Sequence, residues 1–306
     1  MSRLPIAFAA VAMLAACGGV ADPNLADRVT QLERRLDAED AQQQRLLATL
    51  REHGIVFHPD PPKDAAESMA RALEDLELAL ARLESAKETQ DNAKGQSAMA
   101  ALETALQTLR QDPAAAMKAL MAKAEAAAPA QQASLLECYA RVGGAAAAPE
   151  LRAIATATQR PPGLRVAAAR SLIEVDARTA IPAVASLLQE ATPLPELYLL
   201  VHMLAGTGVV EVVPVLAAAL QQNRDRSVRC HAATGLGNFK TGAAVEALAA
   251  AAMGDEYPAV RTNALRALAR AGAPERLREV AEHVRTNDPD SAVRAVAAEL
   301  VSKTGR

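Results

Sequence analysis

A 32-residue repeat fills the C-terminal part of this 306-residue chain and restricts its fold more than any other feature. Blocks that begin at residues 130, 162, 194, 226 and 258 align, and the last 16 residues match half a block. Three columns of this alignment hold apolar residues at helical spacing. The columns are Ala140, Leu172, Leu204, Leu236, Leu268 and Val301; then Val184, Leu216, Leu248 and Val280; then Leu188, Leu220, Ala252 and Val284.

Each block predicts two helices with a turn between them. Alanine, which is abundant throughout the chain, is the best helix former. Helical pairs that recur at a fixed period stack in a row, so that each pair contacts only its neighbours. The sequence therefore predicts an all-α protein in which residues 113–306 form an α-solenoid.

Most blocks open with a Val-Arg pair, followed by small residues and a leucine; the pairs are Val228-Arg229, Val260-Arg261 and Val293-Arg294, with Leu164-Arg165 close. This pattern resembles the short HEAT repeats first described in phycobilisome lyases. The resemblance implies an Arg–Asp ladder, because Asp225 and Asp290 precede their arginines by four residues. Such arginines hold neighbouring turns together; a ligand-facing basic stripe is the alternative. The block at 194 has Leu197-Tyr198 instead, so we expect the ladder to be interrupted there.

Residues 1–16 have the form of a secretory signal: one early arginine, then a run without charge that is shorter than the roughly 20 residues of a membrane span. Leu14-Ala15-Ala16-Cys17 resembles the lipobox of bacterial lipoproteins. That resemblance implies cleavage before Cys17, a covalent lipid on its thiol and an envelope protein anchored to a bacterial membrane. Gly18, where an aspartate would favour the inner membrane, implies the outer membrane, facing the periplasm.

Residues 17–50 form a short tether and then a heptad pattern typical of a coiled-coil stalk. Six of the eight seam positions are apolar. The positions are Leu25, Val29, Leu32, Leu36, Glu39, Gln43, Leu46 and Leu50. A single helix of this length is marginal in water, so residues 25–50 either form a homo-oligomer or pack back onto the body.

Residues 51–63 contain four Gly and Pro residues that break a helix, and we interpret them as a hinge. Residues 64–112 predict two helices, one striped by Leu73, Leu76, Leu80 and Leu83, the other by Ala98, Leu102, Leu106 and Leu109. We expect the break between these two helices at residues 92–95.

The sequence predicts neither catalytic nor metal-binding residues. The five histidines are scattered, and none is followed by glutamate as in the iron hydroxylases built on HEAT-like repeats. The segment GLGNFKTG, residues 235–242, lacks the spacing and preceding strand of a phosphate-binding loop, and we expect it to be a turn. The chain has a net charge of −3 and only 2% aromatic residues. It therefore lacks the basic surface and the stacking side chains that bind nucleic acid, and we do not expect nucleic acid as a partner. We expect no cofactor apart from the lipid.

Two cysteines remain beyond Cys17. Cys138 and Cys230 lie three repeats apart, which corresponds to ~25–30 Å for packed helices. A disulfide requires Cα atoms within about 7 Å. We therefore expect two free, buried thiols.

The function that these features favour is a non-catalytic scaffold or adaptor that binds an unidentified protein through the solenoid. The alternatives are a self-assembling spacer, and an enzyme or its accessory subunit. We expect the second helix of each repeat to line the concave face, with outward alanines at 153, 185, 217 and 249. Tyr198 and Met203, in the divergent block, are the predicted contact residues.

Overall fold

The computed structural model describes residues 62–190 and 196–304. The predicted signal, Cys17, the coiled coil and almost all of the hinge lie outside these residues. Within them, all regular secondary structure is helical. The chain divides into an N-terminal unit that ends at Leu102 and a second unit, the solenoid unit, that begins at Glu103.

The N-terminal unit contains α3 (Ala65–Thr89) and the first part of α4 (Asn92–Leu109). Asp64 caps α3, since its carboxylate accepts a 2.8 Å hydrogen bond from the Glu67 amide. The break predicted at residues 92–95 is wrong: those residues form the first turn of α4. Gln90, with φ of 54°, ends α3 two residues earlier, and the Asp91 carboxylate accepts a 3.0 Å hydrogen bond from the Lys94 amide at the start of α4.

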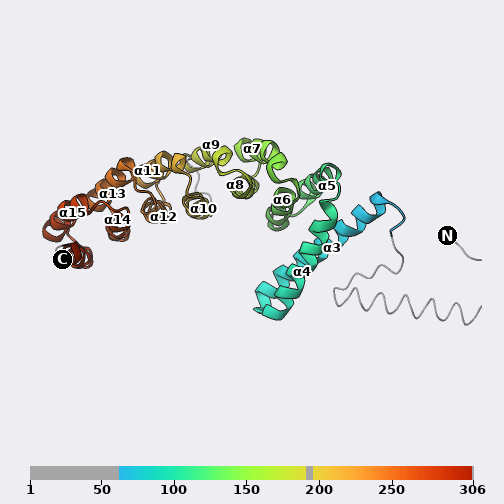
Figure 1. The fold of residues 1–306 in the computed structure, drawn as a ribbon, viewed down its shortest axis with the longest axis horizontal. Coiled ribbons are helices and arrows are strands. Elements are labelled where there is room, and N and C mark those ends of the chain that lie inside the picture. The colour runs from blue at the N-terminus through green and yellow to red at the C-terminus, as the bar shows by residue number, and fades with distance from the viewer. Residues whose placement is uncertain (1–61, 191–195, 305–306) are drawn as a thin grey trace, which may run out of the picture. The chain divides into compact units, whose positions relative to one another are not determined.

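The solenoid unit consists mainly of a run of helix pairs, as the repeat predicts (Figure 1). The first helices of the pairs are α6 (Pro129–Gly143), α8 (Pro162–Val175), α10 (Leu197–Gly206), α12 (Arg226–Leu236), α14 (Pro258–Arg270) and the final α16 (Ser291–Thr304). The second helices are α7 (Ala148–Thr156), α9 (Ala177–Leu188), α11 (Val213–Gln222), α13 (Gly242–Gly254) and α15 (Pro274–Asn287). α5 (Pro113–Ala126) precedes them, and 3-10 turns Gly144–Ala147 and Val210–Val212 lead into α7 and α11.

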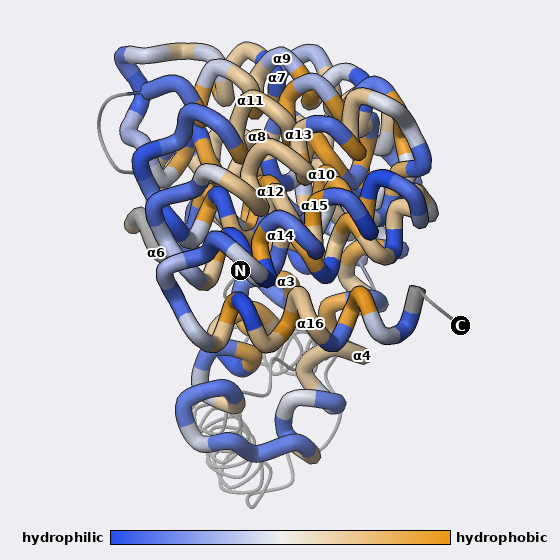
Figure 2. The backbone as a smooth tube through the Cα atoms, turned by 90° about the vertical axis from the view of Figure 1, so that its left-hand side faces the viewer, coloured by the Kyte–Doolittle hydropathy of each residue, from blue (hydrophilic) through white to orange (hydrophobic). Residues whose placement is uncertain are grey.

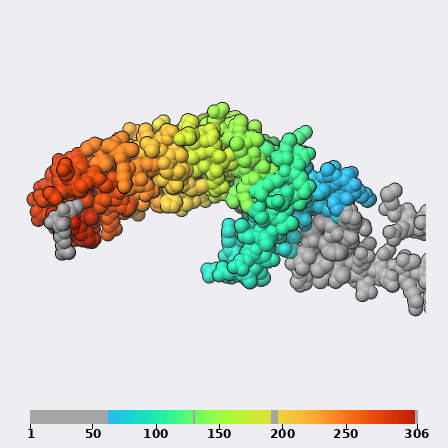
Figure 3. Space-filling model, viewed as in Figure 1, coloured from blue at the N-terminus to red at the C-terminus, as the bar shows by residue number. Residues whose placement is uncertain are grey.

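The helices of this unit form two layers, one of first helices and one of second helices. In Figure 1 the row from α7 to α15 follows the outer side of the curve, and α8, α10, α12 and α14 follow the inner side. The expectation that second helices line the concave face is therefore wrong. Of the four alanines predicted to point outward, Ala153 is exposed, Ala185 and Ala217 are half-buried, and Ala249 is fully buried. Successive repeats form a continuous body in the space-filling view (Figure 3).

The core lies between the two layers, where the repeat columns meet. Every residue of the column Val184, Leu216, Leu248 and Val280 has no exposed surface. Hydrophobic and hydrophilic stretches alternate along the helices in Figure 2, as expected when each helix buries one face. Burial of these columns removes apolar surface from water at about 25 cal/mol per Å², which is the main force holding neighbouring repeats together.

The segment 235–242 contains the predicted turn, which is formed by residues 237–241 between the end of α12 and the start of α13. Its glycines permit close helix packing. A Cβ at Gly237 would lie 2.9 Å from the backbone Cα of Ala267 on α14, and a Cβ at Gly235 would lie 2.5 Å from Cβ of Ala205 on α10. These glycines therefore serve the contact between adjacent first helices.

Candidate functional site

Three arginines of the repeat column are buried inside the solenoid. Arg165, Arg229 and Arg261 are only 2%, 5% and 6% exposed, and each lies near the start of a first helix. A buried guanidinium is costly unless its charge is paired and its N–H groups are satisfied. The partners of these arginines therefore determine how neighbouring repeats are held.

Arg261 shows the complete arrangement. Its Nε and Nη2 donate to the two carboxylate oxygens of Asp288, at 2.7 and 2.8 Å, and its Nη1 donates to the carbonyl of Asp255 at 2.8 Å. Arg229 forms the same arrangement one block earlier. Its Nε and Nη2 donate to the carboxylate oxygens of Asp255 at 2.8 and 3.2 Å, and its Nη1 donates to the carbonyl of Asn223 at 2.8 Å. Each brace joins the first helix, the end of the second helix and the preceding loop. Their burial contradicts a ligand-facing stripe for these two arginines.

The aspartates that the family resemblance implied are not the partners. Asp225 and Asp290 instead cap helices: the Asp225 carboxylate accepts a 2.7 Å bond from the Ser227 amide, and that of Asp290 accepts a 2.8 Å bond from the Ala292 amide. The true partner follows its arginine by 26 or 27 residues, after the second helix of the same repeat. Arg165 follows the same rule with Glu190, 25 residues on.

The ladder is interrupted in the block at 194, as predicted. The 32-residue spacing places Leu197, rather than Tyr198, in the arginine column, and Asn223 in the column of Asp255. Leu197 is buried. The Asn223 side chain donates to the Leu188 carbonyl at 2.9 Å and accepts from the Asp225 amide at 2.9 Å. Both members of the charge pair are thus replaced by neutral residues, which leaves no unpaired buried charge.

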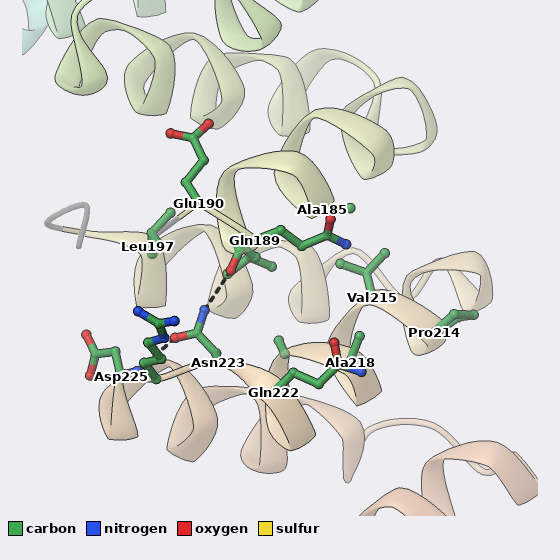
Figure 4. A pocket seen from close by; sticks show the side chains of 13 residues that line it. Ala185, Gln189, Glu190, Leu197, Pro214, Val215, Ala218, Gln222, Asn223 and Asp225 are labelled. Atoms are coloured by element: carbon green, nitrogen blue, oxygen red, sulfur yellow. Dashed lines mark hydrogen bonds between the residues drawn. The ribbon is translucent and has the colours of Figure 1, made fainter. Parts of the chain in front are cut away.

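A groove of about 740 Å³ opens at this junction, between α9 and α11 (Figure 4). We call it the α9–α11 groove. Its apolar lining is Ala185 and Leu188 of α9, Leu197 of α10, and Pro214, Val215, Ala218 and Ala219 of α11. Its polar lining is Gln189, Glu190, Gln222, Asn223, Arg224 and Asp225. It belongs to the outer layer of second helices.

The equivalent place two repeats later is much smaller. Between α13 and α15 a pocket of about 210 Å³ is lined by Arg261 and Asp288, with Met253 and Val284 beside them. There the bidentate ion pair ties the two helix ends together. The loss of this brace at Leu197 and Asn223 therefore coincides with a groove more than three times larger.

Charges at the rim of the groove are unequally compensated. Glu190 is engaged by the Arg165 guanidinium, with Nη1 to Oε2 at 3.0 Å, and Asp225 is engaged as a helix cap. Arg224 is exposed, and its side chain forms no ion pair within the described part of the chain. Arg224 is thus the one charged residue of the groove lining whose side chain has no hydrogen-bond or ion-pair partner among the described residues, while the exposed Asp225 carboxylate beside it keeps its negative charge.

The predicted contact residues lie elsewhere, on α10 in the inner layer. Tyr198 and Met203 are both half-buried and do not line the groove. The centroid of the Tyr198 ring lies 5.0 Å from that of the His231 ring on α12, and the centroid of the His202 ring lies 6.2 Å from that of the His231 ring in a T-shaped arrangement. His231 Nδ1 lies 2.8 Å from the Ser227 carbonyl.

The sequence pattern did not reveal this histidine pair. His202 and His231 occupy different columns of the alignment, and only the packing of α10 on α12 brings them together. Within residues 62–190 and 196–304, no three His, Cys, Asp or Glu side chains converge in a way that could hold a metal ion.

Cys138 and Cys230 are both free thiols, as predicted; Cys138 is buried as expected, but the predicted burial of Cys230 is wrong, since it is only half-buried. Burial raises the pKa of Cys138 to about 12, with a smaller contribution from the charge of Glu137. Burial also raises the pKa of Cys230, which is half-buried, although a hydrogen bond with Asn263 opposes the shift. Neither environment favours the reactive thiolate.

Comparison with known proteins supports the repeat class. A family model described as HEAT repeats matches residues 213–302. Human deoxyhypusine hydroxylase in complex with glycerol is similar at 21% identity, over 68% of this chain and 91% of that chain, with a TM-score of 0.36. A computationally designed self-assembling cyclic homo-oligomer is 15% identical, over 89% and 92%, with a TM-score of 0.17. No curated protein matches. The chain is an all-α solenoid of HEAT-like repeats.

Proposed function

We propose that this chain is a lipid-anchored scaffold of the bacterial envelope, which binds a protein partner through its HEAT-like solenoid. The lipobox-like sequence that ends at Cys17 supports the anchor, and Gly18 supports the outer membrane. Two or more acyl chains hold a protein stably on a bilayer. None of the described helices is long and apolar enough to cross a membrane.

The α9–α11 groove is the observation that carries the binding role. Its volume lies within the roughly 300–1,000 Å³ of typical ligand sites. The residues that line it are apolar, amide-bearing or charged, and include no histidine, cysteine or serine. Its two carboxylates already have partners, since Glu190 is paired with Arg165 and Asp225 caps α12, so the lining suits recognition better than acid–base or nucleophilic chemistry. Anchoring the solenoid raises the local concentration of whatever it holds.

A second candidate is a structural spacer that assembles with its own copies through residues 25–50. The heptad seam favours this candidate. In solution, Leu32→Asp combined with Leu36→Asp would lower the oligomer mass if the seam associates. An unchanged mass would exclude the coil as an oligomer contact.

Affinity capture after mild cross-linking tests the scaffold. The bait is the full chain, compared with a form that ends before Pro113 and with Cys17→Ser. We expect one partner in near-equal amount with the full chain, its loss on truncation, and release of Cys17→Ser into soluble fractions. Recovery of only this chain from both forms would contradict the scaffold and favour the spacer. Membrane retention of Cys17→Ser would contradict the anchor.

A further inference from the structure

We infer that the α9–α11 groove binds an extended peptide segment whose apolar side chains fill the groove and whose acidic side chain meets Arg224. The inference rests on the proposed function, because it names the kind of partner segment that the scaffold would hold. Three features of the groove support it: its apolar walls, its two glutamine side chains and the charge at its rim.

The walls admit apolar side chains of moderate size. Ala185 and Ala218 project little from α9 and α11, while Val215 and Leu197 supply apolar contact surface. The described residues that line the groove include no aromatic side chain, so among them the fit comes from many small contacts. Such a surface binds aliphatic side chains better than large polar ones.

The glutamines favour an extended segment over a helix. Figure 4 shows Gln189 and Gln222 on opposite walls, with both side chains extended in the same direction. Both are exposed, and neither amide has a hydrogen-bond partner within residues 62–190 and 196–304. A primary amide offers donors and an acceptor. An extended peptide presents unpaired backbone N–H and C=O groups to such amides, whereas a helix satisfies these groups internally.

The arginine at the rim indicates which charge the bound segment should carry beside it. Glu190 and Asp225 are engaged by Arg165 and the Ser227 amide. The Arg224 guanidinium is therefore the only charged side chain of the groove lining that lacks a partner within the described residues, and it is free to pair with a group of the ligand. A carboxylate on the bound segment would complement it, and a lysine or arginine in the same place would be repelled. We assign this carboxylate to an Asp or Glu side chain within the segment.

The neighbouring repeats suggest a variant that closes the groove. Leu197→Arg combined with Asn223→Asp rebuilds the pair that Arg261 and Asp288 form at the smaller pocket. A second variant, Arg224→Glu, keeps the groove open and reverses the rim charge. Arg285→Glu, an exposed change of the same type on α15, is the matched control.

Selection of a displayed library of random peptides on the full chain tests the inference. We expect enriched sequences with aliphatic residues and an Asp or Glu at a fixed place, without proline at the positions that pair with the glutamines. The double variant should abolish their binding. Arg224→Glu should weaken it roughly five- to tenfold, through a lost ion pair and a new repulsion. Arg285→Glu should leave it unchanged.

Other outcomes overturn the inference. They are enrichment of basic peptides, enrichment of a helical i, i+3, i+4 pattern, or no enrichment over the double variant. Concentration-dependent self-association that the double variant removes would instead identify a second copy as the occupant. If cross-linked capture still recovers a partner with the double variant, the scaffold stands and the peptide groove fails. If capture fails with the unaltered chain, the scaffold itself fails.

Discussion

Arg261 and Asp288 face each other through two parallel hydrogen bonds of 2.7 and 2.8 Å, although 27 residues separate them in the chain. Both side chains are almost fully buried. The pair closes one repeat on itself, and the third arginine nitrogen reaches back to the Asp255 carbonyl. A short column of such braces stabilises the solenoid at the edge where its loops lie.

Asp288→Asn should strongly destabilise the protein. It removes the charge that compensates a buried guanidinium, and breaking a buried pair in this way costs roughly 3–5 kcal/mol of unfolding free energy. Glu246→Gln is the matched control, since Glu246 pairs with Arg276 at 2.8 Å but is largely exposed; we expect a loss of less than about 1 kcal/mol. Chemical denaturation of the full chain measures both. Similar losses for the two variants would contradict a stabilising brace.

The same pair should make stability depend on pH in the acid range. Burial alone would raise the pKa of Asp288, but the hydrogen bonds and charge of Arg261 outweigh it and lower the pKa below its ordinary value of 3.8. A lowered folded-state pKa stabilises the protein above the unfolded value, and this contribution is lost as pH falls through the folded value. The stability difference between the unaltered protein and Asp288→Asn should therefore stay constant at neutral pH and shrink below about pH 4. A constant difference down to pH 2 would argue against it.

The repeat could be predicted from the sequence because its period fixes which residues face the core. Val184 and Val280 are fully buried for that reason. The arginine partners could not be predicted, since they depend on where the loop after each second helix places its aspartate. Asp225 lies only four residues before Arg229 in the chain, but it does not pair with that arginine, because a residue just before a helix is better placed to cap the helix.

The groove left a signal in the sequence, but one spread over two places. Leu197 departs from the arginine column and Asn223 departs from the aspartate column. Each substitution alone looks like ordinary variation, and only the observed pairing of these columns shows that one brace is missing. The His202–His231 pair likewise depends on the packing of α10 on α12 rather than on any spacing in the chain.

Thiol labelling should distinguish the two cysteines of the solenoid. With a pKa of about 12, the buried Cys138 has almost no thiolate at neutral pH and should resist alkylation in the folded protein. Cys230 is half-buried with a raised pKa, so it should react more slowly than a free thiol but faster than Cys138. Mass spectrometry after timed iodoacetamide exposure measures both rates, and a denatured sample provides the control. Rapid labelling of Cys138 would contradict its burial.

The junction without a brace gives the most specific prediction. Leu197→Arg alone buries an unpaired charge and should cost roughly 3–5 kcal/mol of unfolding free energy, whereas the double variant with Asn223→Asp should recover part of this loss. The coupling between the two sites should therefore be large and favourable, at roughly 1–3 kcal/mol in a double-mutant cycle. Amide hydrogen exchange should also slow at the C-terminal ends of α9 and α11, toward the rates of α13 and α15. Additive effects of the two substitutions, with unchanged exchange, would show that Leu197 and Asn223 do not occupy the positions of a missing brace.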